Sequence, residues 1–199
     1  IIWGCCFALV LLSSTSSYAA TWYVKPSGDD ANAGTSWAAA FKTLQKALAS
    51  VASGDQIWVA AGTYYPDEGG GATNDDRGAA FVMRNGVEIL GGFPATGSPG
   101  LAQRNWTANP TILSGDIGTA GYNDDNSRHV VFNNANGLNA TAILDGFTIA
   151  DGRADGEGFY DRRGGGMHNR SSSPNIRNCT FLENRAISGC GMYNESASP

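Results

Sequence analysis

The chain has 199 residues, a net charge of −5 and 42% hydrophobic residues. This composition excludes a disordered chain, because disordered chains are poor in apolar residues. It also argues against nucleic-acid binding, which needs a basic surface. The 27 glycines and the low share of charged residues, 16%, favour short strands joined by tight corners.

Residues 1–19 have the pattern of a secretory signal peptide. An apolar run covers residues 1–12, and Ser17 and Ala19 stand at the −3 and −1 positions of a cleavage site before Ala20. The run is too short to cross a bilayer. We therefore expect a secreted or outer-surface protein with no membrane span in its mature part. A buried first strand is the alternative for this segment.

Two of the four cysteines remain after removal of this peptide. Cys5 and Cys6 leave with it, whereas Cys179 and Cys190 enter an oxidising compartment. A disulfide between the last two is one option. Because the pair occupies different places in one coil of the repeat described below, two buried thiols are the favoured prediction.

Residues 20–53 are expected to form an N-terminal strand and a capping helix. Ser36 is the candidate N-cap, and an apolar stripe with helical spacing follows it up to Gly54. Lying across the open end of a first coil would bury this stripe and cover exposed strand edges. Cofactor or membrane binding is the alternative. The stripe consists of Trp37, Phe41, Leu44, Leu48 and Val51.

Residues 54–199 carry an internal repeat. Residues 164–169, with the sequence GGGMHN, return as residues 189–194, with the sequence GCGMYN, at an offset of 25 residues. Repeats of this length are typical of solenoids. The predicted fold is therefore all-β, a right-handed parallel β-helix (solenoid) with an N-terminal capping helix. The last repeat has no cap, so we expect the natural protein to continue beyond Pro199.

Stacking of the repeats predicts which residues meet. Met167 should lie beside Met192, Phe147 over Cys179, and Ile149 over Phe181, since equivalent residues of parallel strands are about 4.8 Å apart. His168, aligned with Tyr193, is expected to face outward. Corners need left-handed backbone, which Asn and Gly tolerate, and the residues expected there are Asn169, Asn178 and Asn184.

Several motifs resemble a known family. The sequences WYV at 22–24, IWVAAGTY at 57–64, NPTILSGD at 109–116 and LDGFTI at 144–149 resemble bacterial secreted proteins with pectin-lyase-like right-handed β-helix repeats. The unit with GGM at 165–167 is also similar to the repeat of chlamydial polymorphic outer membrane proteins, although Cys190 replaces a glycine in its next copy. The resemblance covers residues 20–199. It implies the fold and leaves the function open, because this family includes polysaccharide lyases, hydrolases and adhesins.

Candidate binding residues lie in two polar insertions, 118–127 and 155–163, because solenoids place insertions on one side, often the binding side. In the second insertion Tyr160 can stack on a sugar ring, and charged neighbours can bind the ligand. Trp106 and Tyr122 are further aromatic candidates, although packing on the coil flank is favoured for Trp106. The predicted ligand-binding residues are Tyr160, Asp161, Arg162 and Arg163.

Acidic residues could gather around a calcium ion, which prefers oxygen ligands. Asp151, Asp155 and Glu157 form the first candidate set, and Asp116 with Asp124 and Asp125 forms a second. Solvated polar loops and simple turns are the alternatives for both sets.

The predicted function is a secreted or cell-surface scaffold for adhesion or glycan binding, without catalysis. Its partner would be a polysaccharide or a host or cell surface, not nucleic acid. The alternative is a polysaccharide lyase or glycoside hydrolase with its catalytic coils mostly beyond residue 199. A lyase needs a basic residue beside a calcium cluster, and the three lysines, Lys25, Lys42 and Lys46, lie near the cap. No catalytic residue is identified.

Overall fold

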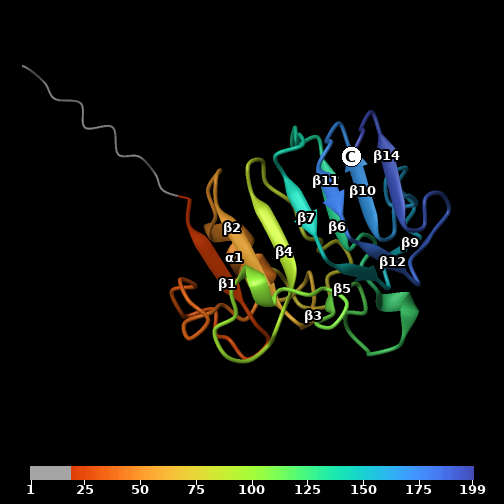
Figure 1. Cartoon of the computed structure of the whole chain (residues 1–199). Helices are drawn as coiled ribbons and strands as arrows, with labels where there is room; N and C mark the ends of the chain where they lie inside the picture. The colour runs from red at the N-terminus through yellow and green to blue at the C-terminus, as the bar shows by residue number, and fades with distance from the viewer. Residues whose placement is uncertain (1–18) are drawn as a thin grey trace, which may run out of the picture.

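A computed structural model describes residues 19–199 of the chain. Short strands that are distant in the sequence lie side by side, and the coils succeed one another from the N-terminal end to the C-terminal end (Figure 1). Every pairing between the described strands is parallel. This is the predicted parallel β-helix, and it places equivalent residues of successive coils in neighbouring layers.

Three sheets line the coils, and a short strand pair extends them. The first sheet has the order β1 (Thr21–Val24), β2 (Gln56–Ala60), β4 (Glu88–Phe93), β7 (Ile143–Asp145), β11 (Asn175–Arg177). The second has the order β3 (Gly62–Tyr64), β5 (Thr111–Ser114), β8 (Thr148–Ala150), β12 (Thr180–Leu182). The third contains β6 (Val131–Asn134), β10 (Met167–Arg170) and β14 (Met192–Glu195), and the pair is β9 (Arg153–Ala154) with β13 (Arg185–Ala186).

The register confirms the predicted stacking. Met167 pairs with Met192, and Phe181 pairs with Ile149. These side chains belong to or pack against one apolar cluster that runs through the coils from Val24 to Met167. Phe181 and Cys179 are only partly buried. The interior is therefore a continuous stack whose burial decreases toward the last coil.

The capping helix is present but shorter than predicted. Helix α1 spans Leu44–Ser50, and its N-cap is Thr43, whose hydroxyl accepts a hydrogen bond from the backbone N–H of Lys46. Ser36 instead closes a turn with Ala39. The start of the predicted helix is wrong because the segment before Thr43 pairs with the first strand: the backbone N–H of Phe41 donates to the Tyr23 carbonyl.

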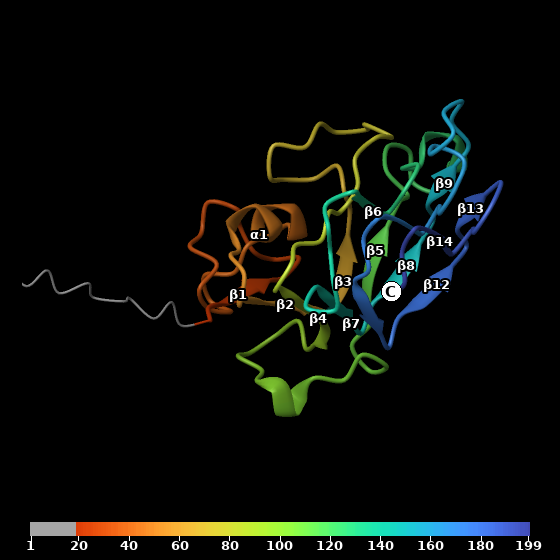
Figure 2. The same cartoon turned by 90° about the horizontal axis from the view of Figure 1, so that it is seen from above.

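The predicted position of this helix is confirmed. Its residues Leu44, Ala47 and Leu48 are buried in the main apolar cluster. Figure 2 shows α1 at the β1 end of the coils, where it covers the interior of the first layer. Trp37 does not belong to the main apolar cluster. It packs against Phe93 of β4 in a second, smaller apolar cluster.

Asn178 occupies a corner with left-handed backbone (φ +47°), as expected. The prediction for Asn169 is wrong, because it lies within β10 and is fully buried. Its amide accepts a hydrogen bond from Asn133 Nδ2 at 2.8 Å and donates one to Asn194 Oδ1 at 3.0 Å. The hydrogen bonds between amides of successive layers offset the cost of burying these polar side chains.

The remaining short elements lie in loops. They are two 3-10 turns, η1 (Leu101–Gln103) and η2 (Asn123–Asp125). Cys179 and Cys190 are free, and Cys190 is exposed, so the prediction of two buried thiols is wrong for it. The predicted signal peptide lies outside the described residues, apart from Ala19. Within residues 19–199 no helix has the length and hydrophobicity of a membrane span.

Candidate functional site

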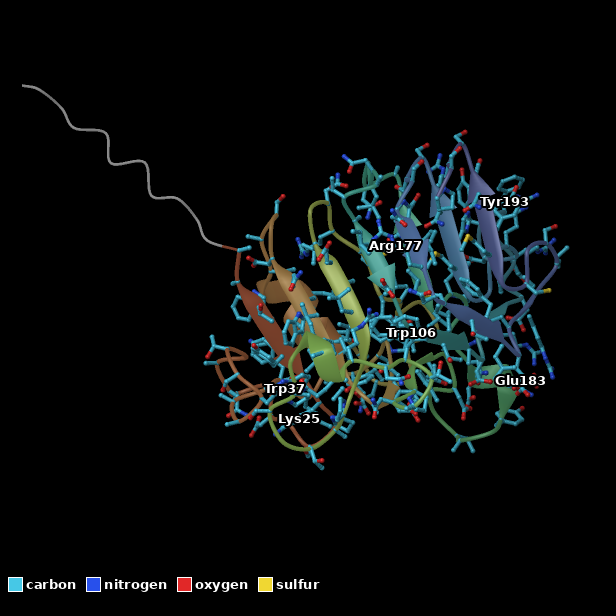
Figure 3. All side chains as sticks on the ribbon, in the orientation of Figure 1. Lys25, Trp37, Trp106, Arg177, Glu183 and Tyr193 are labelled. Atoms are coloured by element: carbon cyan, nitrogen blue, oxygen red, sulfur yellow. The ribbon has the colours of Figure 1, made fainter. Side chains whose placement is uncertain are left out.

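A row of aromatic side chains runs along the outer surface of the third sheet. Phe132, His168 and Tyr193 occupy the same position in three successive coils. Their ring centroids are 5.2 Å and 5.3 Å apart. Successive residues of a strand point to opposite faces, so these rings face away from the interior because Met167 belongs to the core. Figure 3 shows Tyr193 at the last coil, on β14.

The second insertion, residues 155–163, folds over this row. The ring of Tyr160 lies 6.0 Å from that of His168 and 5.3 Å from that of Phe159. His168 therefore points away from the core, as expected for an outward residue, yet it is fully buried. Phe159 is 59% exposed, so the insertion presents an aromatic surface to solvent.

Two arginines lie against these rings. The guanidinium carbon of Arg163 lies 3.5 Å from the ring centroid of Phe159 and 5.3 Å from that of Tyr193. The guanidinium carbon of Arg170 lies 4.6 Å from the centroid of Tyr160. We call the surface formed by Phe159, Tyr160, Arg163, Arg170 and Tyr193 the aromatic ledge. Contacts of this kind hold a cation in place without neutralising it.

The charges on the ledge are not equally satisfied. Arg170 Nε lies 3.9 Å from a carboxylate oxygen of Glu195. Arg163 takes part in none of the ion pairs formed by residues 19–199. It donates a hydrogen bond to the carbonyl of Phe159 at 3.2 Å. The ledge therefore presents a positive group that is held in place and is free to meet an anion.

Two histidines lie beneath the ledge. A ring nitrogen of His129 (Nδ1) lies 3.0 Å from the Gly164 carbonyl, whereas both ring nitrogens of His168 have no partner among the described residues. Burial, His129 and the two arginines lower the pKa of His168 to about 4. His168 is therefore neutral at pH 7, and the arginines provide the positive charge of the ledge.

The structure divides the four predicted ligand-binding residues into two pairs. Tyr160 and Arg163 belong to the ledge. Asp161 and Arg162 hold the insertion in shape: Asp161 lies 4.0 Å from Arg128, and Arg162 donates a hydrogen bond to the Gly156 carbonyl. Sequence reasoning missed Phe159, Arg170 and Tyr193, although the alignment of His168 with Tyr193 in the repeat placed that column on the outer face.

The predicted calcium ligands are not brought together. Asp155 accepts hydrogen bonds from Arg77 and Arg153, each at 2.6 Å. Burial would raise its pKa, but these two arginines lower it. Asp151 instead accepts a hydrogen bond from the Ser114 hydroxyl at 3.0 Å. Glu157 is exposed and takes part in none of the ion pairs formed by residues 19–199.

The second acidic set lies in turns. Asp116 accepts hydrogen bonds from the backbone N–H of Gly121, and Asp125 accepts one from that of Thr119. Asp124 lies 2.5 Å from Arg153. Across the described part of the chain no group of three His, Cys, Asp or Glu side chains could hold a metal ion. The arrangement of these carboxylates is that of turn and ion-pair partners.

Asp151 differs from Asp155 because its pKa is raised rather than lowered. The pKa of Asp151 is raised by burial and by the nearby carboxylates of Asp116 and Glu183, against a lowering by the Ser114 hydroxyl. Asp116 also lines a groove of about 240 Å³ together with Tyr65 and other acidic residues. Asp151 does not line the groove itself, but a carboxyl group with a raised pKa is suited to proton transfer.

Comparison with known proteins gives one match. The model of the family described as "Protein of unknown function (DUF1565)", a family associated with parallel β-helix-like repeats, matches residues 26–197. No curated protein and no solved structure matches the chain.

Proposed function

We propose that this chain, which belongs to the DUF1565 family of proteins of unknown function, is an extracellular β-helix scaffold that binds acidic polysaccharides at the aromatic ledge. The observation that carries the proposal is Arg163, a cation stacked between Phe159 and Tyr193 without a carboxylate partner among residues 19–199. An acidic sugar supplies both features that this site lacks, a negative charge and a flat apolar face.

The chemistry of the ledge fits this ligand. Aromatic rings pack against the C–H face of a sugar, and the Tyr160 and Tyr193 hydroxyls can bind its hydroxyl groups. A guanidinium pairs with a carboxylate through two parallel hydrogen bonds. Arg163 and Arg170 contact different rings of the ledge, so each can meet a separate acidic group of one chain.

The scaffold supports this role by fixing the ledge before binding. Phe132, His168 and Tyr193 stack on a hydrogen-bonded sheet, and Tyr160 rests on this stack. A site built on regular strands loses little conformational freedom when a ligand binds. Because the arginines are near the surface, the interaction should weaken as salt is added.

Binding of polygalacturonate, measured by affinity electrophoresis and isothermal calorimetry, tests the proposal. The double variant Arg163→Ala, Arg170→Ala should bind at least tenfold more weakly than the native chain. Arg177→Ala is the matched control, because Arg177 is an exposed arginine on β11 whose guanidinium donates a hydrogen bond to Asn175 and lies outside the aromatic ledge (Figure 3). Equal weakening in the control, or native affinity in the double variant, would contradict the proposal.

Polysaccharide cleavage is the second candidate function, and the raised pKa of Asp151 favours it. A carboxyl group with a raised pKa is suited to act as a general acid, and Asp151 lies close enough to Asp116, which lines the groove, for the Asp116 charge to raise the pKa of Asp151. Release of reducing ends and the absorbance of unsaturated products distinguish hydrolysis from elimination. The scaffold proposal predicts neither product, whereas turnover that Asp151→Asn abolishes would establish the second candidate.

A further inference from the structure

We infer that a second carbohydrate site, for a neutral sugar ring, lies in the cleft beside Trp106. Trp106 is 42% exposed, and Figure 3 shows it near the middle of the coils, away from Tyr193 and the aromatic ledge. The cleft has a volume of about 260 Å³ and runs along the outer side of the second sheet. Its lining includes Trp106, Thr107, Thr148, Asn178 and Thr180.

The backbone of Trp106 packs closely against two glycines of the first sheet and the turn after it. A side chain at Gly92 would meet the Trp106 backbone at 2.7 Å, and one at Gly146 would meet the Trp106 β-carbon at 3.1 Å. Only glycines at these two positions allow the loop to approach the sheet so closely. The flank packing expected for this residue thus describes its backbone, while its ring remains available.

A buried ion pair fixes the surroundings of the ring. Arg104 donates hydrogen bonds to Asp145 Oδ1 at 2.7 Å and to the Gly91 carbonyl at 2.7 Å. The side chains of Arg104 and Asp145 are 12% and 13% exposed. The guanidinium carbon of Arg104 lies 5.1 Å from the centroid of the Trp106 ring. The ring is therefore positioned before any ligand arrives, which reduces the entropy lost on binding.

The same ion pair orients a polar group in the cleft. Asn178 Nδ2 donates to Asp145 Oδ1 at 2.9 Å, which leaves Asn178 Oδ1 as an acceptor. Asn178 holds this orientation from a left-handed corner, with φ +47°. Thr148 and Thr180, paired in register on β8 and β12, add hydroxyl groups along the same wall. Hydroxyls both donate and accept, as the hydroxyls of a sugar require.

The lining selects a neutral ligand. All residues that line the cleft are uncharged, and the Asp145 carboxylate beneath it is already neutralised by Arg104. The volume is below the range of about 300–1,000 Å³ that is typical of pockets for drug-sized molecules. One exposed aromatic ring, a wall of hydroxyls and a single amide acceptor in this space match one uncharged sugar ring of a longer chain; the second aromatic residue of the lining, Phe147, is buried.

Titration of the full chain with xylohexaose, cellohexaose and mannohexaose, followed by tryptophan fluorescence and calorimetry, tests this inference. At least one hexasaccharide should bind the native chain, and Trp106→Ala should weaken this binding at least tenfold. Tyr122→Ala is the control, because Tyr122 is 54% exposed in another loop and should leave the affinity unchanged. Absence of binding to all three probes, or equal binding by Trp106→Ala, would overturn the inference.

A second variant tests the site independently, in case Trp106→Ala fails to fold. Thr180→Phe fills the cleft from an exposed position of β12, so it should abolish hexasaccharide binding while the melting temperature stays within a few degrees of the native value. Hexasaccharide binding that survives in this folded variant would contradict the site. The Arg163→Ala, Arg170→Ala variant should keep its hexasaccharide affinity, so this site and the aromatic ledge can fail independently.

Discussion

Replacement of Ile149 by alanine measures the contribution of the stacked interior. Ile149 is fully buried and is paired with Leu113 on one side and Phe181 on the other. The change removes three carbon atoms, and each buried methylene contributes about 0.8 kcal/mol, or about 2.4 kcal/mol in all. Because neighbours in both layers are held by sheet hydrogen bonds, the cavity will collapse only in part, and the total loss should approach about 4 kcal/mol.

Urea unfolding followed by circular dichroism provides the assay. The neighbouring variant Thr148→Ala is the control, since Thr148 is half-buried on the opposite face of the same strand, and it should cost less than about 1 kcal/mol. Comparable slopes in urea would show that both variants unfold the same structure. Losses of similar size for the two variants would refute the assignment of interior and exterior faces.

Three further predictions concern pH and backbone contacts. Since burial lowers the folded pKa of His168 to about 4 from 6.5, the unfolded chain binds the extra proton between these values. The free energy of unfolding should therefore decrease as pH falls from 6.5 to 4. His168→Phe should reduce this dependence in urea titrations, and the part that remains is expected from His129, whose pKa is also lowered by burial. Asp55 has a lowered pKa because hydrogen bonds from Ala52, Trp22 and Ala20 outweigh the opposing effect of burial, so its contribution should be complete above about pH 4 and fall as pH drops further. Asp55→Asn should lower the melting temperature at pH 7 and make it fall less steeply below about pH 4. The same steepness below about pH 4 in the variant and the native chain would contradict this prediction. Gly152→Ala would press a methyl group onto the Gly165 carbonyl, which belongs to the same coil, and should lower the melting temperature by several degrees in calorimetry. Gly100→Ala is the control, because its added carbon would make only an ordinary contact with Gln103 at 3.5 Å. Equal melting temperatures for the two variants would contradict the close approach of Gly152 and Gly165.

The repeat was sufficient to predict the fold. The offset between the GGGMHN and GCGMYN segments can be read directly from the sequence. Stacking of these repeats in register places Met167 beside Met192, as predicted. The apolar stripe also predicted the cap. The start of the helix could not be predicted from the apolar stripe. The backbone around Phe41 forms hydrogen bonds to the first strand, and these replace the hydrogen bonds of a further helical turn.

The candidate site was predictable only in part. The position of the second insertion and its Tyr160 and Arg163 followed from composition. That the insertion folds back over His168 did not, because it depends on contacts between rings in three coils and one loop. Asn169 illustrates the same limit, since its amide is satisfied only by amides of the adjacent layers.

Hydroxyl-radical footprinting in the presence of polygalacturonate tests the central claim most directly. If the aromatic ledge binds the polysaccharide, oxidation of Phe159 and Tyr160 should fall severalfold, whereas oxidation of Tyr122 should not change. Phe159 and Tyr122 are both more than half exposed in the free chain, at 59% and 54%, so each can report protection. Binding of the polysaccharide without protection of Phe159 and Tyr160 would contradict the account.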